Sequence, residues 1–139
     1  MNIKHLRAGF IIAGIMNFSV IIFSRGFTNS AMNNADPVVM SNFGLLMVII
    51  WGLAYIATAT IDGNIKWLAG VFAIVKFIYG INWVIWILGN SLTDVYSSDL
   101  FAGLFYSVYG INDFAFMAFF IFVFISEHKK STSSINRND

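Results

Sequence analysis

The sequence contains no cysteine and a single proline, and only 11% of its 139 residues are charged. The absence of cysteine excludes disulfides, thiolate catalysis, iron–sulfur clusters and zinc sites built on thiolates. Hydrophobic residues, in contrast, make up 58% of the chain. So small a polar fraction cannot coat a water-soluble globule of this size. Lipid must therefore be part of the solvent of this protein.

The net charge is small, at +1, and the basic residues gather near the ends of apolar segments. A nucleic-acid-binding surface needs a basic stripe or patch. The sequence therefore predicts no nucleic-acid partner, and the expected partner is the lipid bilayer.

Four apolar segments are long enough to cross a bilayer, which takes about 20 helical residues. They cover residues 8–24, 38–60, 65–89 and 100–125. The predicted fold is all-α, an antiparallel bundle of four transmembrane helices formed by residues 1–125. Residues 126–139 are too polar to pack, and we expect them to form a disordered cytoplasmic tail.

Turn-forming residues mark the starts of three of these helices. Asp36 and Pro37 predict the N-cap and the first position of the second helix. Residues 62–64 predict a tight turn before the third helix, and residues 97–99 can cap the fourth. These short connections predict two helical hairpins.

The first segment also has features of a signal peptide, because Lys4 and Arg7 precede an apolar run of suitable length. Arg25 follows that run directly, and no Ala-x-Ala cleavage site is present. These two observations favour a helix that is retained in the membrane.

The distribution of lysine and arginine predicts the orientation, because cationic segments resist translocation. One side of the membrane would hold Lys4, Arg7, Lys66, Lys129, Lys130 and Arg137. The other side would hold Arg25 and the acidic residues Asp36, Asp94 and Asp99. We therefore expect both termini on the cytoplasmic side.

Two ionisable residues, Lys76 and Asp113, lie deep in the apolar segments. Each is close to the middle of its predicted helix, so both fall near the bilayer centre. A lone charge at that depth costs from about 2.5 to above 10 kcal/mol, so the two residues are predicted to pair. The pair either only fixes the register of the helices or belongs to a functional site, and both interpretations stay open.

Helical spacing places two aromatic residues on the same face as each of these charges. If the two faces meet, they form an aromatic-walled cleft with the ion pair at its floor, and Gly80 and Gly110 allow the helices to approach closely. The alternative is that the aromatic stripes only pack the helices together. The candidate ligand-binding or ion-binding residues are Lys76, Asp113, Tyr79, Trp83, Tyr106 and Tyr109.

The remaining polar residues in the apolar segments carry weaker signals. Asn17, Asn82 and Asn112 add amides of the kind that commonly bridge transmembrane helices. His5 and His128 lie near helix ends and not at midplane depth. The sequence therefore predicts no metal site and no haem-like cofactor.

A resemblance to small four-helix bacterial membrane proteins is carried by two runs, DPVVMSNFGLLMVIIWGLAYIA from Asp36 to Ala57 and DLFAGLFYSVYGINDFAFM from Asp99 to Met117. It extends over nearly the whole chain and implies a bacterial inner-membrane location, but it assigns no activity or ligand. The chain is loosely similar to DoxX-type proteins, with which it shares size and helix count. It resembles small multidrug transporters less, because residues 11–23 hold no glutamate.

Three classes of function follow from these observations. In the first, the protein binds or moves a small ligand or ion at a Lys76/Asp113 cleft. In the second, it is a structural or accessory subunit that docks on a larger membrane complex or forms a homo-oligomer. An enzyme ranks third, because the apolar segments hold no recognisable nucleophile–base arrangement. A Schiff-base chromophore on Lys76 is chemically conceivable but has the least support.

Overall fold

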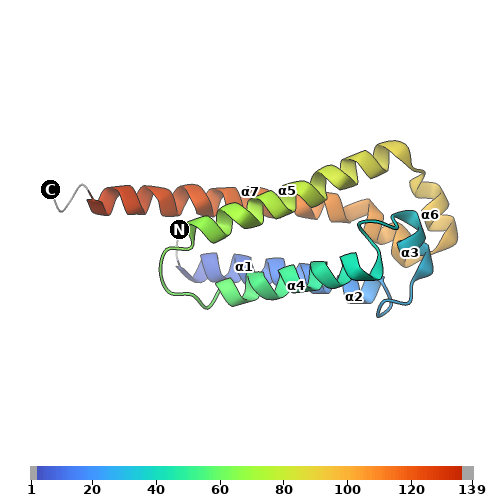
Figure 1. Cartoon of the computed structure of the whole chain (residues 1–139), viewed down its shortest axis with the longest axis horizontal. Helices are drawn as coiled ribbons and strands as arrows, with labels where there is room; N and C mark the ends of the chain where they lie inside the picture. The colour runs from blue at the N-terminus through green and yellow to red at the C-terminus, as the bar shows by residue number, and fades with distance from the viewer. Residues whose placement is uncertain (1–2, 136–139) are drawn as a thin grey trace.

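The computed structural model describes residues 3–135, and it describes side chains up to residue 128. All regular secondary structure in this part of the chain is helical, and it contains no strand. Its helices are α1 (Ile3–Phe18), α2 (Val20–Phe23), α3 (Ser30–Ala35), α4 (Asn42–Thr58), α5 (Lys66–Gly89), α6 (Leu92–Ser98) and α7 (Leu100–Ile135). The long helices run along one axis, and α3 and α6 lie together at one end of it (Figure 1).

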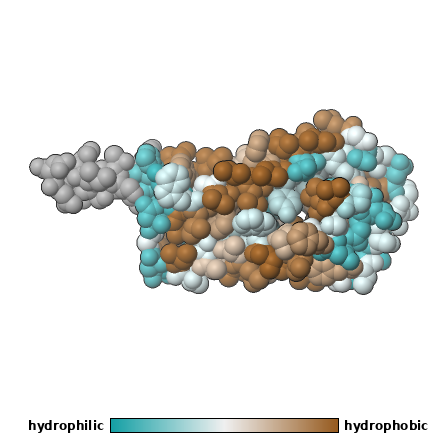
Figure 2. Space-filling model, in the orientation of Figure 1, coloured by the Kyte–Doolittle hydropathy of each residue, from teal (hydrophilic) through white to brown (hydrophobic). Residues whose placement is uncertain are grey.

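Three helical segments among the described residues are long and apolar enough to cross a membrane: Ile3–Phe23, Lys66–Gly89 and Leu100–His128. The fourth long helix, α4, is apolar but has only 17 residues. The surface is apolar over the middle of the long axis and hydrophilic at both ends (Figure 2). A hydrocarbon layer between two aqueous layers requires this pattern, so these features are those of a membrane protein.

The start of α4 corrects the prediction that the second apolar helix begins at residue 38 behind an Asp36 cap. Asp36 does cap a turn, because its Oδ1 accepts a hydrogen bond from the Val39 amide at 3.0 Å. That turn does not continue into α4. Ser41 caps the helix instead, and its Oγ accepts a hydrogen bond from the Gly44 amide at 3.1 Å.

The end of α7 corrects the prediction of a disordered tail over residues 126–139. The helix continues to Ile135 and projects beyond the other helices, while residues 136–139 lie outside the described part (Figure 1). No glycine or proline occurs between residues 126 and 135. Extending an existing helix needs no new nucleation, so α7 runs on from the apolar segment into polar sequence.

The connections at the α3–α6 end contain two short helices that the sequence does not predict. Asn29 caps α3 by accepting from the Met32 amide at 3.3 Å, and Ser91 caps α6 by accepting from the Asp94 amide at 3.3 Å. Asp99 was predicted to cap the next helix, and its Oδ1 accepts from the third amide of α7 at 2.9 Å. The third predicted helix, 65–89, is confirmed within one residue.

The long helices pack most closely in two pairs, α1 with α4 and α5 with α7. Glycines bring the backbones together at the second interface, as the sequence predicts. A Cβ on Gly80 would lie 2.9 Å from the Phe114 ring, and a Cβ on Gly110 would overlap the Trp83 ring. Larger residues at either position would push α5 and α7 apart.

Two apolar cores follow one another along the axis. One lies at the end that holds Lys4, Arg7, Lys66 and His128, which we call the basic end; the other lies at the α3–α6 end. The basic-end core consists of Phe10, Ala13, Tyr55, Ala59, Ile65, Ala69, Phe72, Ala73, Phe120 and Val123. The α3–α6-end core consists of Val20, Met32, Met40, Leu45, Trp86, Ala102, Phe105, Tyr106 and Tyr109. On each of α1, α5 and α7, one buried polar residue lies between the two cores.

Candidate functional site

Three buried polar side chains meet between the two cores: Asn17 of α1, Lys76 of α5 and Asp113 of α7. We call them the central cluster. Lys76 Nζ donates hydrogen bonds to Asp113 Oδ1 at 2.6 Å and to Asn17 Oδ1 at 2.9 Å. The predicted pairing of Lys76 with Asp113 is therefore confirmed. The Asn17 side chain is a second hydrogen-bond partner of the Lys76 ammonium.

The orientation of the Asn17 amide follows from its second partner. Its Nδ2 donates to the Val48 carbonyl of α4 at 2.8 Å, so its Oδ1 faces the Lys76 ammonium. The central cluster thereby links all four long helices. Asn17 was predicted only as a helix-bridging amide and not as a site residue. Its position near the middle of the first apolar segment, 8–24, at the same expected depth as Lys76 and Asp113, was the signal that could have placed it in the site.

Aromatic rings cover the remaining side of the Lys76 ammonium. Its Nζ lies 5.5 Å from the centre of the Tyr55 ring and 5.8 Å from the centre of the Phe116 ring. A cation at this distance is attracted by the negative face of an aromatic ring, and the attraction grows when water is excluded. Tyr55 lies on α4 and was not among the predicted site residues.

A cavity of about 110 Å³ adjoins the central cluster. All four long helices and α2 contribute to its wall, and its polar lining includes Asn17, Ser19, Lys76, Asn112 and Asp113. A single water needs about 10–15 Å³ of such space, so the cavity has room for several waters. Sites for drug-sized ligands are larger, at about 300–1,000 Å³. The cavity therefore suits water, an ion or a ligand of a few heavy atoms.

Two tyrosine hydroxyls on the cavity wall have no hydrogen-bond partner among the described residues. They belong to Tyr55, which is fully buried, and Tyr109, which is 6% exposed. A buried hydroxyl without a partner costs roughly 1–3 kcal/mol. Both residues line the cavity, but their hydroxyl oxygens are themselves buried, so a polar occupant would reach them only after a small shift of the rings.

The position of the cavity corrects the prediction of a cleft between the third and fourth apolar helices. These helices, α5 and α7, pack directly on each other, and the cavity lies between the two helix pairs. Of the four predicted aromatic residues, Tyr79 and Tyr109 line the cavity and Trp83 and Tyr106 do not.

Trp83 and Tyr106 hold the helices together instead. Trp83 Nε1 donates to the Tyr106 carbonyl at 2.7 Å, and the Tyr106 hydroxyl donates to the Met32 carbonyl of α3 at 2.9 Å. Trp83 lies seven residues beyond Lys76, which is about 10 Å along a helix. Sharing a helical face therefore does not bring both residues to one site.

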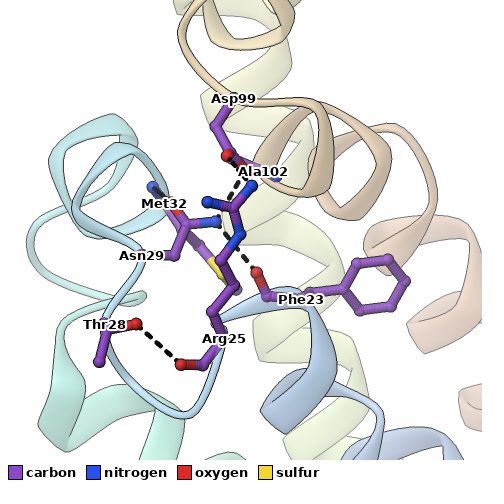
Figure 3. Close-up of polar contacts among 7 residues, drawn as sticks. All are labelled: Phe23, Arg25, Thr28, Asn29, Met32, Asp99 and Ala102. Atoms are coloured by element: carbon purple, nitrogen blue, oxygen red, sulfur yellow. Dashed lines mark hydrogen bonds and ion pairs between the residues drawn. The ribbon is translucent and has the colours of Figure 1, made fainter.

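A second polar cluster lies at the α3–α6 end and consists of Arg25, Asn29 and Asp99. We call it the end cluster. Arg25 Nη2 lies 2.5 Å from Asp99 Oδ2, and Asn29 Nδ2 donates to Asp99 Oδ1 at 2.8 Å and to the Phe23 carbonyl at 3.0 Å. Both side chains point toward Asp99 at the start of α7 (Figure 3).

The end cluster fixes a strained loop to α7. Arg25 and Phe27 adopt left-handed backbone conformations, with φ of 49° and 70°, which L-residues other than glycine rarely adopt. Partial burial raises the pKa of Asp99, but hydrogen bonds from the Ala102 amide and Asn29 and the charge of Arg25 outweigh it and hold the pKa below its ordinary value. The folded loop thus stabilises the ionised carboxylate.

Comparisons with protein-family models, with curated proteins and with solved structures find no match to this chain. Among the described residues, no group of three or more His, Cys, Asp or Glu side chains is arranged to hold a metal ion. The interpretation of the site therefore depends on its geometry alone.

Proposed function

We propose that this protein crosses the bacterial inner membrane four times, with both termini on the cytoplasmic side, and binds or moves a small polar ligand or ion at the central cluster. The 17 residues of α4 lie at the short end of the range for a spanning helix, about 17–25 residues. The helix also packs along α1, which is long enough to span together with α2. The first residues of α1 and the last of α7 lie at the basic end, which the distribution of lysine and arginine assigns to the cytoplasm (Figure 1).

The observation that carries the binding proposal is the cavity beside the ion pair, with its two partnerless tyrosine hydroxyls. A purely structural pair needs no such space, because interiors pack to high density. Binding requires Lys76 or Asp113 to exchange its partner for the ligand. The cavity supplies the room for this exchange, and the hydroxyls of Tyr55 and Tyr109 supply replacement hydrogen bonds.

The test uses the purified full-length chain in detergent and in liposomes. Thermal unfolding and ion flux are measured with halides, nitrate, alkali cations, ammonium and a proton gradient as probes. We expect at least one probe to stabilise the protein or to cross the membrane. Tyr55→Phe and Tyr109→Phe should weaken that response severalfold, because they remove one hydroxyl each and keep the ring.

Tyr106→Phe is the matched control, because it also removes a tyrosine hydroxyl of α7 but one that bonds Met32 outside the cavity. It should leave the response to the probe unchanged. Absence of any response in the wild-type protein would overturn the binding proposal. An equal loss of response in all three variants would show that the response does not depend on the cavity.

The accessory-subunit hypothesis keeps one specific observation in its favour. Asp113 and Asn17 together engage Lys76 and connect four helices, as a purely structural cluster would. Under this hypothesis, a variant with both charges replaced by apolar residues folds and still purifies with its partner complex. Under the binding proposal, the same variant folds and loses the response to the probe.

A further inference from the structure

A shallow apolar groove of about 350 Å³ runs between α5 and α7 near the basic end. Its lining includes Trp67, Gly70, Ala73, Ile74, Ile121 and Phe124, and none of its residues lines the cavity of the central cluster. Small residues form its floor, while Trp67 and Ile74 are 74% and 61% exposed. The groove therefore faces the surroundings of the protein, which along this stretch of apolar helix are lipid.

The groove begins at a positive charge. Lys66 Nζ lies 4.7 Å from the centre of the Trp67 ring and 5.3 Å from that of the Phe124 ring, and both rings belong to the groove. The same nitrogen lies 2.8 Å from His128 Nδ1. None of these three partners carries negative charge, so they hold the ammonium in place without neutralising it.

The groove is long enough for the upper part of a lipid chain. From Lys66 to Ile74 is eight residues, or about 12 Å along the helix. Gly70 keeps this path open, because its missing Cβ would lie 3.2 Å from Phe124. A cation at the membrane surface, followed by an apolar channel toward the membrane interior, is complementary to a phosphate with an acyl chain attached.

We propose that this groove binds an anionic phospholipid, with the phosphate at Lys66 and His128 and one acyl chain along α5 and α7. Two observations favour this occupant over a second helix: the positive charge at the head of the groove, and the apolar side chains that line the groove and face outward. Basic pockets between transmembrane helices on the cytoplasmic side are typical sites for anionic head groups.

Trp67 provides the reporter for the test. The full-length chain is placed in phosphatidylcholine nanodiscs that contain a small fraction of either brominated phosphatidylglycerol or brominated phosphatidylcholine. Bromine quenches tryptophan fluorescence on contact, and the difference from Trp67→Phe isolates the signal of Trp67. We expect phosphatidylglycerol to quench Trp67 at about one fifth of the phosphatidylcholine fraction, since one lysine near an anionic surface contributes about fivefold in affinity.

Lys66→Gln should abolish this preference, whereas Lys66→Arg and Lys4→Gln should keep it. Lys4→Gln is the matched control because it removes one charge from the same end, on α1 and outside the groove. Gly70→Leu should reduce quenching by both lipids, because the leucine fills the groove. Gly89→Leu is its control, since Gly89 lies on the same helix with no atom within 4 Å of an added Cβ.

Equal quenching by both lipids in the wild-type protein, or an unchanged preference in Lys66→Gln, would overturn the proposal. Quenching by neither lipid would show that protein covers the groove, whether a second copy or another partner, and would also overturn it. Melting curves confirm that each variant is folded before it is compared. The result is independent of whether the central cluster binds a ligand, because the two sites share no residue.

Discussion

The central cluster and the end cluster contain the same chemical groups: one cation, one aspartate and one asparagine. They differ in their exposure to water. The difference lies in the cation: the Lys76 side chain is 4% exposed and that of Arg25 is 53% exposed, while Asp113 and Asp99 are both largely buried, at 8% and 11%. Breaking a buried pair leaves an uncompensated charge in a medium that cannot solvate it, while water solvates the partners of an exposed pair. Burial therefore decides how much stability depends on each cluster.

The largest expected effect separates the two ion pairs. Lys76→Met and Asp113→Asn should each lower the free energy of unfolding by about 3–5 kcal/mol, and the double variant Lys76→Met/Asp113→Leu should recover most of the loss. Arg25→Gln should cost about 1 kcal/mol or less. Thermal unfolding in one detergent measures all four variants. Equal losses at the two clusters would show that burial does not distinguish them.

The asparagines sharpen the same comparison. Asn17→Ala removes an acceptor from the buried Lys76 ammonium and a donor from the Val48 carbonyl, and should cost about 1–3 kcal/mol. Asn29→Ala removes the cap of α3 and a bond to Asp99. Asn29 is as buried as Asn17, at 5% and 6% exposed, but Asp99 keeps its bond to the half-exposed Arg25, so the loss should be about 0.5–2 kcal/mol. Unfolding in the same conditions compares them, and a larger loss at Asn29 would contradict the ranking.

Tyrosine-to-phenylalanine variants test whether the partnerless hydroxyls at the cavity lower the stability of the fold. Tyr55→Phe and Tyr109→Phe remove hydroxyls that have no partner among the described residues, so stability should stay the same or rise by up to about 1 kcal/mol. Tyr106→Phe should instead cost about 1 kcal/mol, because it breaks the bond to the Met32 carbonyl. A loss of stability in both cavity variants would show that their hydroxyls are already satisfied.

The smallest effect is a pH dependence of the end cluster. The pKa of Asp99 is lower in the folded than in the unfolded protein, so the stability it contributes is present above the unfolded-state pKa and is lost as the pH falls through the folded-state pKa. Unfolding of the wild type and of Asp99→Asn, measured between about pH 5 and about pH 2, isolates this contribution. The two curves should converge at the acidic end. A constant difference would mean that Asp99 does not titrate with folding.

Much of the fold could be predicted because it depends on local properties of the chain. The segment 65–89 matches α5 within one residue, since a long apolar run between polar turns defines a helix by itself. The start of α4 could not be predicted in the same way. Asp36 and Pro37 form a real capped turn, but the chain changes direction after it and begins the helix only beyond Ser41. A cap signal marks a turn and not the length of the helix that follows.

The site could be predicted only in part, because only part of it depends on local properties of the chain. Lys76 and Asp113 had to find a partner inside the apolar segments, and each offered the other the opposite charge. Tyr79 and Tyr109 lie one turn away from these residues and line the cavity, whereas Trp83 and Tyr106, about two turns away, pack against other elements. Helical periodicity identifies a face but does not show which neighbour covers each level of it.

The sequence by itself determined that this chain is a helical membrane protein and that its two buried charges pair. Both follow from the free energy of placing apolar and charged groups in lipid, which depends on composition and depth alone. Only the tertiary structure decided that Asn17 joins the pair, that Tyr55 covers the lysine, and that the cavity lies between the two helix pairs. These features depend on how the helices rotate and approach one another. That geometry is set by side chains from distant parts of the chain packing together, so no local stretch of sequence contains it.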